Sequence, residues 1–288
     1  MTEQSHPVPK TNWLKMCAAA VGITLLLLSI NLTLGIRETF RMEIIAMVYI
    51  PAVCMALYCW FRKLGAWSNL LQAIGVPLGI FASVFMFVYD LTSMSEDENL
   101  FPAIARSFLA IFHGGLIAAF GYFMTGHDVD RDANHSPGDR LALSLMIILP
   151  FCAGLLFFPV SISTFFDLAT FMLFAAPLVM LTATGPNTLS INRLLRAVVV
   201  GMLGPVLISM TAWLLGQGDN RSLGPAMAVG LLGLLYGAWT TFAIGSFRHA
   251  NTNNLRHLWR ASWHSLEIYA LLILIVFAPP SLIEIMNS

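Results

Sequence analysis

The sequence predicts an all-α, polytopic membrane protein of eight or nine transmembrane helices, arranged as two related four-helix halves. Three observations predict this: the chain is apolar, long apolar stretches recur along it, and its two halves resemble each other. Of the 288 residues, 58% are hydrophobic and 10% are charged, and the mean hydropathy is +0.77. A soluble domain carries about 25% charged residues. Most of this surface is therefore expected to face lipid, and the zero net charge argues against binding to nucleic acid.

The individual helices follow from the length of the apolar stretches. A helix rises ~1.5 Å per residue, so about 20 apolar residues cross ~30 Å of hydrocarbon. The first stretch has no cleavage site after it and is too long for a signal peptide, so we interpret it as a retained span. For the last stretch, the sequence leaves open whether it spans the bilayer or lies at its interface. The predicted spans are 14–35, 44–61, 70–92, 101–125, 141–160, 164–184, 194–216, 223–246 and 265–283.

The orientation follows from the lysines and arginines in the loops, which gather on the cytoplasmic side of membrane proteins. With the N-terminus inside, only Arg37, Arg41 and Arg221 fall in outer loops. The sequence therefore predicts a multi-pass protein with a cytoplasmic N-terminus. The residues then on the cytoplasmic side are Lys10, Lys15, Arg62, Lys63, Arg131, Arg140, Arg193, Arg196, Arg248, Arg256 and Arg260.

An internal repeat divides the chain, with a period of about 123 residues. The segment 100–105 aligns with 223–228, and each follows a polar outer loop and enters the membrane at a proline. Four spans lie in each half, so the halves share one orientation and are related by an axis along the membrane normal. The predicted parts are a first membrane repeat (1–126), a cytoplasmic junction loop (127–140), a second membrane repeat (141–247), and an interfacial segment with a ninth helix (248–288).

The second half resembles a known family. The residues that carry this resemblance are Gly-Met-Leu-Gly-Pro-Val-Leu at 201–207, Leu-Gly-Pro-Ala-Met-Ala-Val-Gly-Leu-Leu at 223–232, and the pair Tyr236-Gly237. They are similar to the last two helices of the MotA/TolQ/ExbB proton-channel family, and 165–170 is similar to the start of its second helix. The resemblance covers about 157–247 and, more faintly, 66–125.

This resemblance implies a homo-oligomeric ring around the single helix of a partner that carries a membrane carboxylate, with ion flow driving mechanical work. It also implies the inner (cytoplasmic) membrane of a bacterium. The chain departs from the family at Gly233 and Leu234, where motor-type members have threonines, and at Pro205, where members have a threonine. It also lacks their large cytoplasmic domain.

Four ionisable residues lie within or at the edge of predicted spans, where charge is costly and points to function. Asp90 and Arg106 lie near the outer ends of the third and fourth spans, at similar depth, so they can pair. Such a pair either locks the helical hairpin or gates the outer mouth of an ion path. His113 either relays protons, because imidazole titrates near physiological pH, or bonds a neighbouring helix. Asp167 begins the sixth span, where the family also has an acidic residue, and is expected to cap the helix.

Small residues mark the eighth predicted helix, which enters the membrane at Pro225. Gly233 and Gly237 have G-x-x-x-G spacing, and Gly230 lies one turn earlier on nearly the same face. Glycines at this spacing let helix backbones approach closely, within or between subunits. We expect this helix to pack in an oligomeric interface.

Other chemistry is weakly indicated. The segment 247–264 is basic and aromatic, which is typical of a helix lying at the cytoplasmic interface. We interpret His127 and His135 as part of a solvated loop rather than metal ligands. No catalytic or phosphate-binding motif is present, so the sequence predicts no enzyme, cofactor or metal.

The leading hypothesis is thus a proton or ion channel, or an energy-coupling component, that works with a single-span partner. A non-conducting scaffold would explain the missing threonines and the missing cytoplasmic domain. A small-molecule transporter would explain Asp90, Arg106 and His113 as groups along a substrate path.

Overall fold

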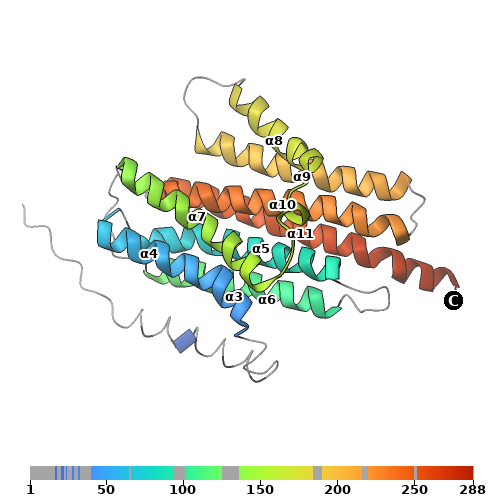
Figure 1. The fold of residues 1–288 in the computed structure, drawn as a ribbon, viewed down its shortest axis with the longest axis horizontal. Helices are drawn as coiled ribbons and strands as arrows, with labels where there is room; N and C mark the ends of the chain where they lie inside the picture. The colour runs from blue at the N-terminus through green and yellow to red at the C-terminus, as the bar shows by residue number, and fades with distance from the viewer. Residues whose placement is uncertain are drawn as a thin grey trace, which may run out of the picture.

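The computed structural model shows a helical bundle, and the part of the chain that it describes contains no strand (Figure 1). It describes residues 40–64, 66–93, 101–124, 136–183, 190–215, 220–249 and 252–287, with single positions at 17, 21, 22, 24, 28 and 32. The helices are α3 (Met42–Ile44), α4 (Ile50–Arg62), α5 (Trp67–Ser93), α6 (Phe101–Met124), α7 (Pro137–Phe157), α8 (Leu168–Ala183), α9 (Ile191–Leu215), α10 (Asn220–Arg248) and α11 (Thr252–Asn287). A π-helical turn, η1 (Ile45–Tyr49), joins α3 to α4, and a 3-10 turn, η3 (Ile162–Phe165), precedes α8.

Six helices are long and apolar enough to cross a membrane, counting only the described residues. They are Met42–Arg62 (α3, η1 and α4 together), α5, Ile104–Met124, α7, Ile191–Ala212 and Met227–Arg248. The predicted class is confirmed to this extent. Of the three other predicted spans, 14–35 lies almost wholly outside the described residues, α8 has only 16 residues, and 265–283 forms part of α11.

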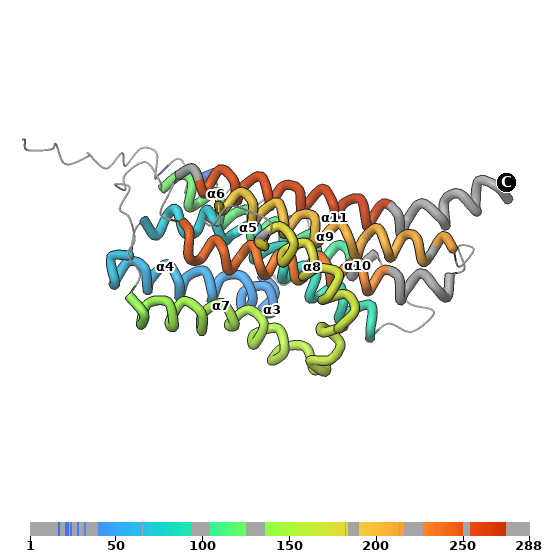
Figure 2. Tube along the Cα trace, turned by 90° about the horizontal axis from the view of Figure 1, so that it is seen from above, coloured from blue at the N-terminus to red at the C-terminus, as the bar shows by residue number. Residues whose placement is uncertain are grey.

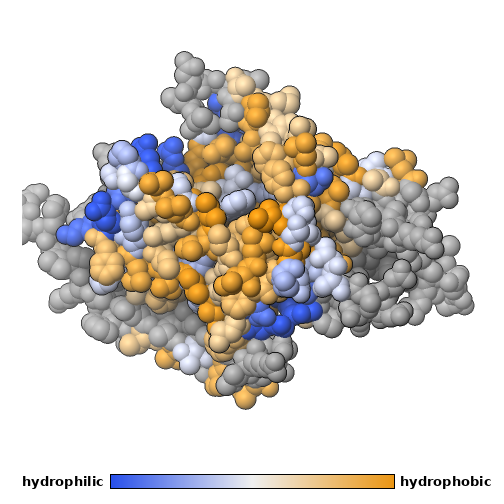
Figure 3. Space-filling model, viewed as in Figure 1, coloured by the Kyte–Doolittle hydropathy of each residue, from blue (hydrophilic) through white to orange (hydrophobic). Residues whose placement is uncertain are grey.

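The surface has the polarity of a membrane protein. The face seen in Figure 3 is largely hydrophobic. Hydrophilic residues gather at two places on it, beside the end of α4 with the start of α7, and beside α3. Exposed leucines on α7 include Leu141, Leu145 and Leu156, at 64%, 60% and 82%. Side chains of this size exposed over a whole helix face mark a surface that meets lipid or another protein.

Helix α5 is the central element of the bundle. Within its most apolar window 94% of residues are buried, against 22% for α7. It contacts α4, α6, α7, α10 and α11. A helix that is apolar on all sides must be surrounded by other helices or by lipid, and here the other helices surround it.

The closest helix contact in the core joins α5 to α6. A Cβ atom added to Gly75 would lie 2.6 Å from the carbonyl oxygen of Gly114, and one added to Gly114 would lie 2.5 Å from that of Gly75. Gly79 faces the backbone of Ala110 and Gly114 in the same way. Only residues without a side chain allow the two backbones to touch, so these glycines set the packing distance of the hairpin.

Proline explains the π-turn in the first described span. Pro51 has no N–H to donate to the preceding turn, so a regular helix cannot pass through it without losing a hydrogen bond. The five-residue turn η1 ends two residues before this proline, and α4 begins at Ile50. This turn carries Tyr49, which matters for the site described below.

The C-terminal region is one helix rather than two segments. The sequence predicts an interfacial segment followed by a ninth helix over 248–288, whereas α11 runs unbroken for 36 residues beside α9 and α10 (Figure 2). At ~1.5 Å per residue its length is about 54 Å, well beyond the ~30 Å of a bilayer core. The basic residues Arg256, Arg260 and His264 are exposed on the outer face of its first turns, while Leu255, Leu258 and Ala261 are buried against the bundle.

Candidate functional site

An ion pair joins the ends of the α5–α6 hairpin, as the sequence predicts. One guanidinium nitrogen of Arg106 lies 3.3 Å from Asp90 Oδ1. The Asp90 side chain is 7% exposed and that of Arg106 is 35% exposed. The second carboxylate oxygen of Asp90, Oδ2, is buried and has no hydrogen-bond partner within the described part of the chain. A buried carboxylate oxygen without a donor is costly, because nothing replaces the water that it lost.

Two further charges surround this pair. Arg41 and Glu43, at the start of the first described span, form a pair of their own with 3.5 Å between Arg41 Nε and Glu43 Oε2. Both lie close enough for their charges to act on Asp90. The result is a cluster of two cations and two anions at one end of the bundle. From the sequence, Arg41 is predicted only as a charge of an outer loop, although its position just before a span places it at the same membrane surface.

His113 lies deeper in the bundle and bonds to another helix. Its side chain is 1% exposed, and Nδ1 lies 2.7 Å from the hydroxyl of Tyr49 in η1. The rings of Phe40, Tyr49 and Phe112 enclose the imidazole, with centroids 5.5–6.1 Å away. Of the two interpretations left open by the sequence, the structure shows the helix–helix hydrogen bond. His113 and Arg106 are seven residues apart on α6, which is about 10 Å along the axis.

Three buried hydroxyl groups connect α5, α6 and α11. Ser83 donates to the hydroxyl of Tyr269 (3.0 Å), which donates to Ser107 Oγ (2.9 Å). Ser107 donates in turn to the carbonyl of Ile104, so each hydroxyl hydrogen has an acceptor. Sequence reasoning missed this chain of hydrogen bonds, because Ser83 and Tyr269 are 186 residues apart. A lone tyrosine inside a predicted span was the only signal for it.

Asp167 caps α8, as expected. Its carboxylate accepts hydrogen bonds from the amide (2.8 Å) and the hydroxyl (2.5 Å) of Thr170. These two bonds stabilise the charged form and hold the pKa of Asp167 below its usual range. The backbone N–H of Asp167 donates to the hydroxyl of Tyr236, which donates to the carbonyl of Phe165. Asp167 therefore fixes the entry of α8 against α10.

A second buried carboxylate, Asp139, ties α7 to α4 at the opposite end. It accepts from Arg62 Nε (3.0 Å) and from the Tyr58 hydroxyl (2.8 Å). It also completes a capping box with Ser136, whose backbone N–H and hydroxyl both donate to it. Sequence reasoning missed this residue, yet the spacing Ser136-x-x-Asp139 before an apolar run is a recognisable helix-start signal.

The glycine face of α10 is covered by the same chain. Gly233 lies against Pro205, Gly237 against Met202, and Gly230 against Leu272 and Ser209. The structure therefore uses this face for packing against α9 and α11 within one chain, where the sequence predicts an oligomeric interface. Pro225 belongs to the first turns of α10, where the structure describes the backbone path alone.

Among the described residues, no three His, Cys, Asp or Glu side chains lie close enough together to hold a metal ion. His127 and His135 of the junction loop lie outside the described residues. Of the four ion-path candidates, Asp90 and Arg106 are brought together, while His113 and Asp167 each have separate partners.

Comparison with known proteins identifies no relative: no protein-family model, no curated protein and no solved structure matches this chain.

Proposed function

We propose that this protein is an ion-conducting or energy-coupling membrane subunit of the MotA/TolQ/ExbB type, in which Asp90 and Arg106 gate the outer end of the ion path. The observation that carries the proposal is the buried carboxylate of Asp90, whose Oδ1 is paired and whose Oδ2 is unpartnered among the described residues. A static structural pair would satisfy both oxygens, because burial makes each unmet bond costly. An ion path needs a free acceptor that a proton or cation can occupy.

The pair has the asymmetry that a gate requires. Asp90 is held inside the bundle at 7% exposure, whereas Arg106 is 35% exposed and its long side chain can turn toward the surface. Protonation of Asp90 would remove the attraction and release Arg106. Arg41 and Glu43 would keep the surrounding cluster balanced in charge.

Several parts of the proposal rest on the sequence. These are the two parallel four-helix repeats, the homo-oligomer, the cytoplasmic N-terminus, the bacterial inner membrane, and the single-span partner with its membrane carboxylate. The helical hairpins α5–α6 and α9–α10 support the repeat, since the aligned segments fall near the starts of α6 and α10. The surfaces that meet other subunits would have to be other than the glycine face of α10.

A non-conducting scaffold is the second candidate, and one observation favours it. The backbones of α5 and α6 touch through Gly75, Gly79 and Gly114. Helices held this closely form a rigid hairpin, which suits a protein that holds others in place.

Flux in proteoliposomes tests the proposal. The purified protein, with any single-span protein that native mass spectrometry finds bound to it, is reconstituted around a pH-sensitive dye under an imposed potential. We expect Asp90→Asn to reduce proton flux, because the amide releases Arg106 but cannot accept a proton, and Arg106→Gln to increase flux, because the acceptor stays and the pair is broken. Each change should be about tenfold, the effect of ~1.4 kcal/mol. The matched control is Arg62→Gln, which breaks the Arg62–Asp139 pair at the opposite end and should leave flux unchanged.

Three results would contradict the proposal. Absence of flux in the wild type, with and without a bound partner, would favour the scaffold. Equal losses of thermal stability in all three variants, with no change in flux, would reduce the Asp90–Arg106 pair to a structural role. Stabilisation by a small-molecule substrate in detergent would favour the transporter hypothesis instead.

A further inference from the structure

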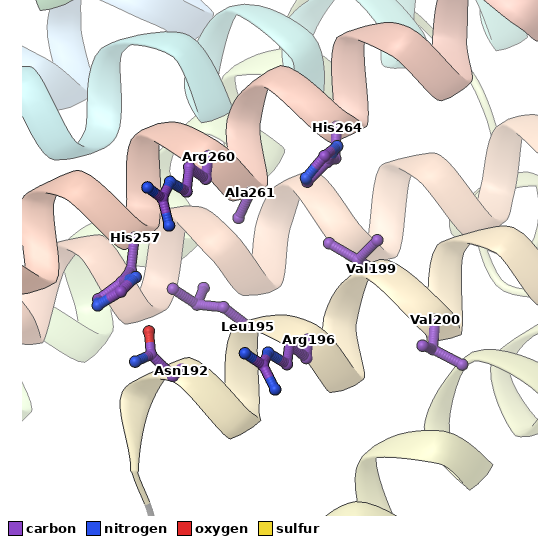
Figure 4. A pocket seen from close by; sticks show the side chains of 9 residues that line it. All are labelled: Asn192, Leu195, Arg196, Val199, Val200, His257, Arg260, Ala261 and His264. Carbon is purple, nitrogen blue, oxygen red and sulfur yellow. The ribbon is translucent and has the colours of Figure 1, made fainter.

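A groove between α9 and α11 carries a concentration of basic groups that the proposed function does not use. Its volume is about 430 Å³, and Figure 4 shows the side chains from both helices that line it. Arg196 and Asn192 come from α9, and Arg260, His257 and His264 come from α11. Two helices far apart in sequence thus present nitrogen donors to one space.

The charge of the groove is unbalanced. Both arginines are always protonated in proteins, and no lining residue in the described part of the chain is a carboxylate. Glu267 is not among the residues that line the groove, and it pairs with His264 at 3.0 Å. Two cations facing one groove repel each other unless an anion lies between them. The groove therefore favours a ligand with negative charge.

The basic end of the groove lies where the helices α9 and α11 reach the membrane surface. The apolar span of α9 begins at Ile191, so Asn192 and Arg196 lie in its first two turns. On α11, Trp259 and Trp263 flank Arg260, and Trp263 is 57% exposed. Tryptophan is enriched where the hydrocarbon meets the headgroups. The basic groups thus lie at the level that lipid phosphates occupy.

At the other end of the groove the lining residues of α9 are apolar, and they lie opposite His264 of α11 (Figure 4). Val199 and Val200 line it one turn further into the span of α9. A groove with two arginines at the membrane surface and two valines below them matches a phospholipid, whose phosphate is followed by acyl chains. A free phosphate would gain nothing from the valines.

We propose that this groove binds an anionic phospholipid. Arg196 and Arg260 hold its phosphate from opposite helices, Asn192 and His257 add hydrogen-bond donors, and Val199 and Val200 contact the first part of an acyl chain. The lipid thereby links α9 to α11. By the distribution of lysine and arginine this end of the bundle is cytoplasmic, where anionic headgroups attract basic groups. The site stands independently of the proposed ion path.

Lipid retention measured by native mass spectrometry tests this proposal. The protein in detergent is supplied with equal amounts of phosphatidylglycerol and phosphatidylcholine, and the bound fraction of each is measured. We expect phosphatidylglycerol to be preferred, and Arg196→Gln and Arg260→Gln each to lower its retention about fivefold, the effect expected of one basic group near a membrane surface. The matched controls are Arg193→Gln and Arg256→Gln, which remove charges from the same helices outside the groove.

The outcomes separate a site from general attraction. Losses as large in the control variants as in the groove variants would overturn the proposal, as would equal retention of the two lipids by the wild type. Thermal stabilisation by inorganic phosphate, without selective retention of phosphatidylglycerol, would assign the groove to a soluble anion and also overturn it. Unchanged melting temperatures of the four variants without added lipid would show that the comparison concerns folded protein.

Discussion

Asp90, His113, Asp139 and Asp167 show how single polar residues are accommodated within an apolar bundle. Each has at least one partner within reach: Asp90 has an arginine, His113 a tyrosine hydroxyl, Asp139 a serine cap and an arginine, and Asp167 a threonine. Burial without such partners would cost several kcal/mol per group. Asp90 differs from the others because one of its oxygens is unpartnered among the described residues. That difference is why the proposed gate is placed there.

At the same scale, Asp167 predicts a dependence of stability on pH. Its folded-state pKa is lowered by the Thr170 hydrogen bonds, while its unfolded-state pKa is about 3.9. A carboxyl with a lowered folded pKa stabilises the fold above its unfolded pKa and loses this contribution as the pH falls through the folded value. We expect Thr170→Val to lower the free energy of unfolding at pH 7 by about 1 kcal/mol, and this deficit to shrink as the pH falls below about 3.9.

Denaturation in detergent across pH 2 to 7 measures this difference. Thr170→Ser is the control, because it keeps the hydroxyl and should follow the wild type in its pH dependence. A deficit of the same size at every pH would mean that Thr170 acts through packing rather than through the Asp167 carboxylate.

Among the elements, the α5–α6 hairpin depends on glycine at particular positions. A Cβ at Gly114 would meet the carbonyl oxygen of Gly75 at 2.5 Å, whereas a Cβ at the neighbouring Gly115 has nothing within 4 Å. We expect Gly114→Ala to destabilise the protein by about 1–3 kcal/mol, since the backbone itself must move. Gly115→Ala should be neutral or stabilising by up to about 1 kcal/mol, because alanine favours the helix.

The two alanine variants differ by one position and add the same methyl group, so helix propensity cancels in the comparison. Unfolding followed by circular dichroism in the same detergent gives both values. Equal stabilities would show that the two backbones are further apart than the structure places them.

For the whole molecule, the question at the glycine face of α10 is whether it packs within one chain or between subunits. Gly237 is in direct contact with Met202 of α9, within one chain. We expect Gly237→Leu to lower the stability of the chain itself by about 2–3 kcal/mol through overpacking, while the folded fraction keeps the mass of the wild type. Combining Gly237→Leu with Met202→Ala should recover part of this loss, because removing the Met202 side chain opens some of the space that the leucine needs.

Size-exclusion chromatography with light scattering measures the mass, and thermal melting measures the stability. A stable Gly237→Leu variant with an altered oligomeric state would return this face to a subunit interface.

Local features of the chain were sufficient to predict much of the fold. Apolar stretches predicted each of the six spans because hydrocarbon thickness sets helix length. The Asp90–Arg106 pair was predictable because a hairpin brings positions equally far from its loop to the same depth. The cap at Asp167 was predictable because a helix N-terminus attracts a carboxylate from its own chain. Each of these inferences uses interactions within one helix or one hairpin.

Tertiary structure decided what depends on the rotation of helices about their axes. Apolar helices in lipid bury no clear hydrophobic stripe, so hydropathy does not reveal which faces meet. Hence three sets of contacts could not be predicted from the sequence alone. They are the Ser83–Tyr269–Ser107 hydrogen bonds, the partners of Asp139, and the neighbours of the α10 glycines. The basic groove also exists only because α9 and α11 pack so that Arg196 and Arg260 line one space. The sequence determined that this chain forms membrane helices and where its charges lie; close packing of those helices determined which charges meet.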